Sequence, residues 1–169
     1  MAAESFYRLE QEATANWRTV EVCDDGRIST TLVTVIGGSE IESPNLDEPE
    51  EFVTVLIRNT FPCEGDPIVE RASGPADFTV SDSLKLASVE GLVTLRSGEQ
   101  AAISVSWTAT GSLETTTNTT QFPGFVGIFK GKEREAVATG SVVVGGENLV
   151  NGPSVSGSIE TLEDRNLTI

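Results

Sequence analysis

The carboxylates are the residues of this chain whose type and spacing most readily suggest chemistry. Hard cations such as calcium take oxygen ligands from flexible acidic loops. A weak calcium site is therefore one hypothesis, although the alternating Asp-x-Asp-x-Asp-Gly loop is missing and acidic runs interrupted by proline are usually solvated. The ligands of such a site would be Asp24, Asp25, Asp47, Glu48, Glu50 and Glu51. No other cofactor is expected.

Histidine is absent from all 169 residues of the sequence. Because histidine is the usual general base near neutral pH and the commonest transition-metal ligand, its absence excludes histidine-dependent triads and most zinc sites. A hydrolase of this composition would need two carboxylates that face each other across a cleft, one of them with a raised pKa. Such a pair could come from Glu90, Glu114, Glu133, Glu135 or Glu160, which lie on or beside predicted strands. The wet face of a sheet is the commoner place for these residues.

The aromatic residues suggest a binding surface instead of catalysis. Phe122, Phe125 and Phe129 are interrupted by proline and glycine and could form an exposed apolar patch, with a core strand bent at its glycines as the alternative. Trp17 and Trp107 fall in phase with the apolar positions of their segments, so both are expected in the core.

Cys23 and Cys63 are the only cysteines. An even number of cysteines in a small β domain suggests a disulfide, and two buried thiols are the alternative. Two cysteines without histidine leave the ligand set of a zinc site incomplete.

The charge balance restricts the partners. With 26 acidic and 11 basic side chains the net charge is −15, which disfavours nucleic acids and anionic membrane surfaces. No apolar run approaches the ~20 residues that a membrane helix needs. The N-terminal residues lack the pattern of a secretory signal, so a cytoplasmic location is expected, or a secreted one if a signal has been removed.

Alternation with period two predicts strands along most of the chain. Residues 101–110 alternate most clearly, and residues 84–95 are expected to pair with them through a four-residue turn at 96–99. Residues 13–22 and 28–36 form a second predicted hairpin around Asp25 and Gly26. Residues 51–61 are the candidate central strand. Further strands are expected over residues 68–71, 76–80, 125–130, 135–144, 155–162 and the C-terminus.

Three segments break this pattern. Residues 39–51 and 111–121 are predicted to be exposed loops, the second because threonine dominates it. Residues 1–12 are expected to form a short helix or a flexible arm, since Phe6, Leu9 and Ala13 are spaced as on one helical face. The whole chain is predicted to be one antiparallel β-sandwich domain over residues 1–169, immunoglobulin-like or jelly-roll-like, with a closed barrel as the second choice.

Several segments together carry a resemblance to known proteins: residues 13–17 leading to Val22 and Cys23, then Cys63, residues 107–111, residues 136–144 and residues 155–159. In these segments the sequence resembles a group of uncharacterised β-sandwich proteins of actinobacteria and cyanobacteria. The resemblance implies a single β domain and no assigned activity. Members often carry a phenylalanine and a histidine near residues 121–125, and the histidine is missing here, so no role for it is carried over.

These observations favour a non-catalytic binding or assembly module. Its partner would be a protein, a second copy of the chain or a saccharide, bound at an edge strand or at residues 122–129. The alternatives are a histidine-free hydrolase with paired carboxylates and a structural component of an envelope or particle. A concave site where two acids converge would favour the hydrolase, and a flat or edge-strand surface with dispersed acids would favour the module.

Overall fold

The computed structural model describes residues 3–169 and is built of antiparallel strands. No helix in that range is long and apolar enough to cross a membrane. The strands are β1 (Ala3–Val22), β2 (Ile28–Glu42), β3 (Glu50–Asn59), β4 (Ile68–Val80), β5 (Leu86–Thr94), β6 (Gln100–Ala109), β7 (Glu114–Phe122), β8 (Phe125–Val144), β9 (Glu147–Asn148) and β10 (Ser156–Thr168).

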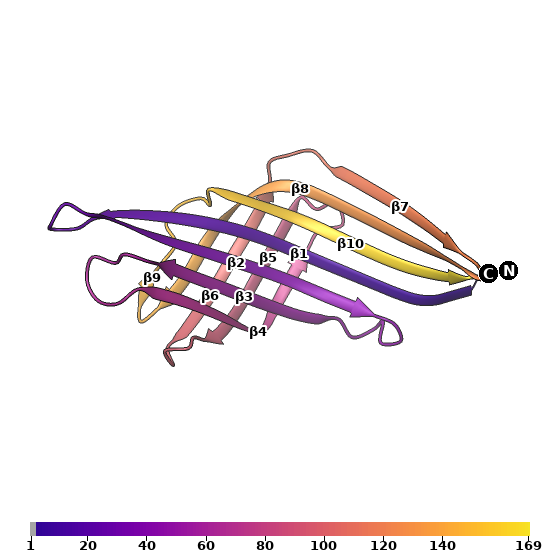
Figure 1. Ribbon diagram of the computed structural model, residues 1–169, viewed down its shortest axis with the longest axis horizontal. Coiled ribbons are helices and arrows are strands. Elements are labelled where there is room, and N and C mark those ends of the chain that lie inside the picture. The colour runs from indigo at the N-terminus through magenta and orange to yellow at the C-terminus, as the bar shows by residue number, and fades with distance from the viewer. Residues whose placement is uncertain (1–2) are drawn as a thin grey trace.

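The strands are hydrogen-bonded in a ring with two layers. The order β10-β1-β2-β3-β4-β5-β6-β8 closes where β10 pairs with β8, and β7 and β9 attach to β8 outside that path. Strand β4 changes layer after Pro75, since residues 68–75 pair with β3 and residues 76–80 with β5. Strand β8 does the same after Glu135, pairing first with β10 and then with β6. In Figure 1 the long strands of one layer cross those of the other steeply, as in sandwiches whose corner strands switch sheets.

The core lies between the two layers and follows the alternation of the sequence. On β6, Ala101, Ile103, Val105 and Trp107 are buried, and the residues between them are exposed. Strand β3 lies between β2 and β4 and contributes Val53, Val55 and Ile57. Trp17 and Trp107 are both buried, as expected, and their indole nitrogens donate to the carbonyls of Gly152 and Thr14. The predicted all-β antiparallel fold is confirmed.

Both predicted hairpins are present. Strands β1 and β2 pair through residue pairs from Arg8–Glu42 to Val22–Ile28, and Gly26 has the positive φ of 85° that the turn requires. Strands β5 and β6 pair over their full lengths, with Gly98 at φ 90° in the turn between them.

Glycine is also required at one close approach between strands. Gly140 of β8 lies at φ 149°, and a Cβ there would overlap the carbonyl oxygen of Ser104 on β6. Any side chain at this position would therefore force β8 away from β6.

Two expectations for secondary structure are wrong. Residues 3–12 form the first half of β1 and not a helix, because β2 and β10 pair with this segment from either side; Met1 and Ala2 lie outside the described residues. Residues 114–121 belong to strand β7 and not to a loop, although they are exposed as expected. For residues 39–51 the loop is shorter than predicted, because β2 continues to Glu42 and β3 starts at Glu50.

Candidate binding surface

Five strands continue beyond the core as a single-layered sheet, which we call the extension. It consists of residues 3–12 of β1, 39–42 of β2, 114–122 of β7, 125–135 of β8 and 160–168 of β10. None of these residues is buried. Figure 1 shows β1, β7, β8 and β10 running together to the tip where β1 begins and β10 ends. A β-sheet is normally covered on at least one face, whereas no second sheet packs on either face of the extension within residues 3–169.

The three predicted patch phenylalanines lie on one face of the extension. Arg134 of β8 is paired with the buried Ile159 of β10, so both side chains point to the side of the core. Phe125 and Phe129 are an odd number of residues away from Arg134 on the same strand and therefore point to the opposite side. We call this opposite side the outer face. Phe122 of β7 is paired with Phe125, and their rings stack with centroids 4.9 Å apart. The exposed fractions are 48% for Phe122, 36% for Phe125 and 37% for Phe129. Together they form an accessible apolar patch.

A row of four glutamates crosses the same outer face. The register pairs Glu114 with Glu133, Glu133 with Glu160 and Glu160 with Glu12, on four successive strands. Like charges directly opposite each other destabilise a sheet. Partial burial raises the pKa of Glu160, and the carboxylates of Glu12 and Glu133 raise it further. Partial burial likewise raises the pKa of Glu12, with the charge of Glu10 adding to the shift.

The opposite, inner face of the extension carries most of its basic residues. Lys130 and Lys132 of β8 border a concavity of about 200 Å³ with Leu9, Leu84, Glu163 and neighbouring polar side chains. Neither lysine has an ion-pair partner among residues 3–169. Arg165 lies over the ring of Tyr7, 5.2 Å from its centroid. The extension is therefore predominantly acidic on its outer face and more basic on its inner face.

The turn between β4 and β5 closes the inner concavity against the core. Leu84 has a positive φ of 57°, which is rare for a leucine, and its side chain is buried. Arg134 holds this turn in place, because its Nε donates to the carbonyl of Ser83 at 2.8 Å and its guanidinium also donates to the carbonyl of Gly111. Sequence analysis did not single out Leu84 or Arg134. No pattern in the sequence marks a left-handed leucine.

Strand β7 forms a free edge of the extension. Within residues 3–169 it pairs only with β8, and all nine of its residues are exposed. The sequence does not reveal this strand, because a segment exposed on both faces shows no alternation of apolar and polar residues. Its run of threonines, which favour strands, was the available signal.

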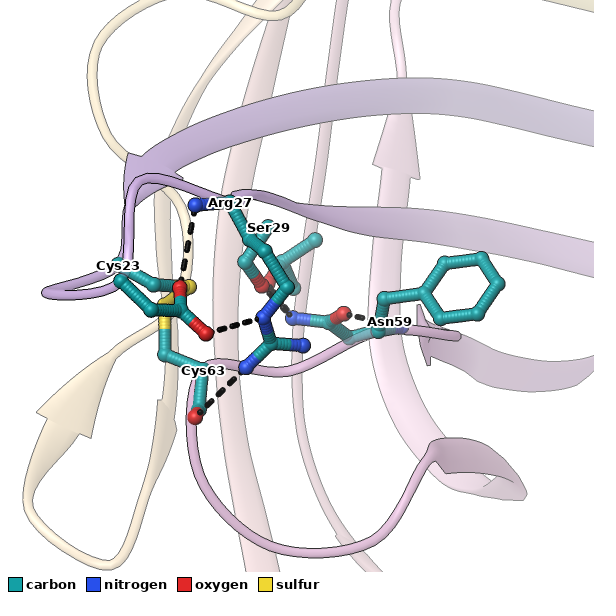
Figure 2. The surroundings of a disulfide bond; sticks show 8 residues. Cys23, Arg27, Ser29, Asn59 and Cys63 are labelled. Atoms are coloured by element: carbon teal, nitrogen blue, oxygen red, sulfur yellow. Dashed lines mark hydrogen bonds and ion pairs between the residues drawn. A yellow bond between two sulfur atoms is a disulfide. The ribbon is translucent and has the colours of Figure 1, made fainter.

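The opposite end of the molecule carries the disulfide. Cys23 and Cys63 are bonded, with their Cα atoms 5.2 Å apart, so the predicted pairing is present. Figure 2 shows Arg27 beside the bond, where its Nε donates to Asp25 Oδ2 at 2.6 Å and its Nη2 donates to the carbonyl of Cys63. The hydrogen bonds from Arg27 lower the pKa of Asp25.

A buried asparagine joins β2 and β3 beside the disulfide. The Asn59 amide nitrogen donates to Ser29 Oγ at 2.8 Å and to Thr31 Oγ1 at 3.0 Å, while Oδ1 accepts from the backbone of Phe61. A hollow of about 650 Å³ opens here among Cys23, Asp24, Asn59, Glu64 and Glu147. Because the side chain of Asn59 is fully hydrogen-bonded within the chain, this residue is best explained as structural.

The predicted calcium ligands lie in separate places. Asp24 and Asp25 belong to the β1–β2 turn, whereas Asp47 and Glu48 lie in the β2–β3 loop. Glu51 accepts a hydrogen bond from the backbone of Phe78, and Glu50 borders a concavity with Glu48. Within residues 3–169 no three acidic or cysteine side chains are arranged to hold a metal ion. Calcium binding stays a prediction for these residues.

The fold brings some of the candidate catalytic carboxylates together. Glu114, Glu133 and Glu135 border a concavity of about 220 Å³ with Gly111 and Ser112. Glu160 follows Glu133 in the glutamate row, whereas Glu90 lies on β5 and accepts from Ser104. The two residues whose pKa is raised, Glu12 and Glu160, do not border that concavity. Some of the candidate carboxylates are therefore neighbours, but they lie on an open sheet surface.

Comparisons with known proteins add little to this geometry. No protein-family model matches the chain, and no curated protein sequence matches it. A solved structure of a candidate AttH protein from Nitrosomonas europaea aligns with 95% of this chain at 12% identity and a TM-score of 0.26. The alignment covers 51% of that protein, so the present chain spans about half of its length. A likeness of this degree supports no conclusion about the chain.

Proposed function

We propose that this protein is a non-catalytic binding module whose macromolecular partner docks on the extension. The observation that carries the proposal is that no second sheet packs on either face of the extension within residues 3–169, and none of the residues of the extension is buried. A soluble protein rarely exposes clustered large apolar side chains without a use for them. Here Phe122, Phe125 and Phe129 are exposed together on one face.

The division of the molecule into two parts supports this function. The sandwich holds the core, and strands β1, β8 and β10 run continuously from it into the extension. Sites on strands anchored in a packed core keep their geometry better than sites on loops. The extension can therefore present a fixed surface.

Site-specific photo-crosslinking tests the proposal. A benzoylphenylalanine at position 129 is expected to give a discrete adduct in the cell that makes the protein. The matched control carries the same group in place of Leu92, an exposed apolar residue on β5 of the sandwich. Equal adducts from both positions, or none from position 129, would overturn the proposal. A series of adducts of increasing mass from position 129 would indicate that the protein binds as a structural component of a larger particle.

The glutamate row favours a second candidate, a carboxylate-dependent hydrolase. Partial burial and neighbouring carboxylates raise the pKa of Glu160, so it could act as a general acid beside the side chain of Glu133 or Glu12. This candidate ranks lower because the row lies on an open face, and the adjoining concavity of about 220 Å³ is smaller than most substrate pockets. Hydrolysis of aryl glycosides that is abolished by Glu160→Gln would establish it, and inactivity of the wild-type protein would dismiss it.

A further inference from the structure

We propose that the partner at the free edge is a second copy of the chain, paired antiparallel through β7. This inference rests on the proposed function and names the partner of the same surface. A twofold axis would pass near Asn118, and the five-stranded extensions of the two copies would form one continuous sheet.

The free edge of β7 lacks every usual protection against pairing. Proteins protect edge strands with lysine, proline, inward charges or a covering segment. From Thr115 to Gln121 the strand contains only threonine, asparagine and glutamine, and its partner within residues 3–169 is β8 alone. Such an edge can accept a further strand without burying a charge.

Another open edge shows the protections that β7 lacks. Within residues 3–169, residues 68–75 of β4 pair only with β3, but this segment carries Glu70 and Arg71 and ends at Pro75. The carboxylate of Glu70 also accepts from the backbone of Arg96 at 3.0 Å, which places the β5–β6 turn beside this edge. The same fold thus protects one edge and leaves the other open.

The sequence of β7 is compatible with itself in the antiparallel direction. With complete overlap, Asn118 lies opposite its own copy, and threonines lie opposite threonines on either side of it. Cross-strand threonine pairs stabilise a sheet. The only charged residue of the strand, Glu114, would lie opposite Phe122. The complete pairing is Glu114–Phe122, Thr115–Gln121, Thr116–Thr120, Thr117–Thr119 and Asn118–Asn118.

The geometry of the two free edges favours the antiparallel direction. A parallel pair of β7 edges would need a twofold axis along the strand, which would turn the acidic outer face of one copy to the side of the other copy's inner face. In the antiparallel pair the two rows lie at opposite ends of β7, about 27 Å apart at 3.4 Å per residue. This separation exceeds the Debye length of about 8–10 Å at physiological ionic strength, so the rows hardly repel each other.

Native mass spectrometry with a matched pair of variants tests the proposal. We expect the wild-type protein to give a dimer of the 17.9 kDa chain at tens of micromolar. Asn118→Lys places two lysines opposite each other at the axis and should weaken dimerisation by about fivefold or more. Asn151→Lys makes the same change at an exposed position between β9 and β10 and should leave the dimer intact. A monomeric wild-type protein, or equal dimerisation of the two variants, would overturn the proposal.

Cysteine cross-linking tests the register and is independent of the lysine variants. Thr116→Cys and Thr120→Cys lie opposite each other only across the axis, at a Cα separation that a disulfide accepts. Oxidation by diamide, which accepts the two thiol hydrogens, should cross-link a mixture of the two variants. Neither variant alone should cross-link, and cross-linking of one alone to the same extent would contradict the register.

The two proposals fail in different ways. A monomeric wild-type protein that still forms a discrete adduct at position 129 would overturn the dimer and retain the binding module. A dimer that survives Asn118→Lys, together with no adduct at position 129, would overturn both.

Discussion

Strand β1 passes through two different surroundings along its length. In the sandwich, Ala13, Ala15 and Trp17 face the opposite layer and are at most 2% exposed. In the extension, Tyr7 and Leu9 continue on the same side of the strand but are only partly buried, because the opposite layer ends at the β4–β5 turn beside Leu9. The alternation is similar in both halves. The difference comes from what covers the strand.

This difference assigns stability to the sandwich and recognition to the extension. The buried residues that form the core belong to the sandwich, and the disulfide and the buried Asn59 lie at the end remote from the tip. The extension holds the exposed phenylalanines, the glutamate row and the free edge of β7. Changes in the sandwich should therefore affect folding, and changes in the extension should mainly affect association.

Removing an indole from the core should cause the largest difference in stability between a variant of the sandwich and a variant of the extension. Trp107→Ala is expected to lower the free energy of unfolding by about 3–5 kcal/mol, because it leaves a cavity among buried residues. Phe129→Ala on the extension should lower it by less than about 1 kcal/mol, since that ring is already partly solvated. Urea unfolding followed by circular dichroism measures both. Equal losses would show that the extension is part of the folding core.

Replacing both cysteines should have the next largest effect. Cys23→Ser with Cys63→Ser removes a cross-link between residues 40 positions apart and should destabilise the fold by about 2–4 kcal/mol. Because the bond lies far from the tip, the dimer should still form when the variant is folded. Thermal unfolding gives the first result and native mass spectrometry the second. Loss of dimerisation in a folded variant would contradict the separation of the two regions.

The glutamate row should make the stability of the protein depend on pH. A raised pKa in the folded state means that ionised Glu12 and Glu160 destabilise the fold, and this penalty is fully present above the folded pKa. It declines as the pH falls through that pKa toward the unfolded value of about 4.3. The penalty from the row should therefore decline, and the fold should become more stable, as the pH is lowered from 7 through the folded pKa.

Glu160→Gln checks this assignment. The substitution should raise stability at pH 7 by under about 1 kcal/mol and should flatten the pH dependence. Glu90→Gln, on β5, is the control and should leave the pH dependence unchanged. Thermal unfolding at several pH values measures the effect, and an unchanged profile for Glu160→Gln would show that the row does not repel itself.

The sequence predicts the sandwich better than the extension for a physical reason. Alternation appears where one face is buried and the other is wet, as on β6, and it locates the β5–β6 hairpin. Strand β7 has two wet faces, so its threonines resemble a loop. In residues 3–12 the spacing of Phe6 and Leu9 also fits a helix, and only the pairing with β2 and β10 determines the strand.

Part of the candidate binding surface could be predicted from the sequence. Phe122, Phe125 and Phe129 could be named from the sequence because glycine and proline separate them, and the register places them on one face. The row from Glu114 to Glu12 could not be predicted, because its members come from four strands that are far apart in the chain. Long-range register determines such a row, and local sequence does not encode it.

Hydrogen–deuterium exchange at low and high protein concentration tests most directly the claim that the extension is the recognition surface. Backbone amides on the free side of β7 have no partner within residues 3–169 of the same chain and should exchange fast at low concentration. Protection of residues 114–122 is expected to rise with concentration, while β3 and β6 in the sandwich stay equally protected throughout. Exchange in β7 that is independent of concentration, or a change spread equally over both regions, would contradict the claim.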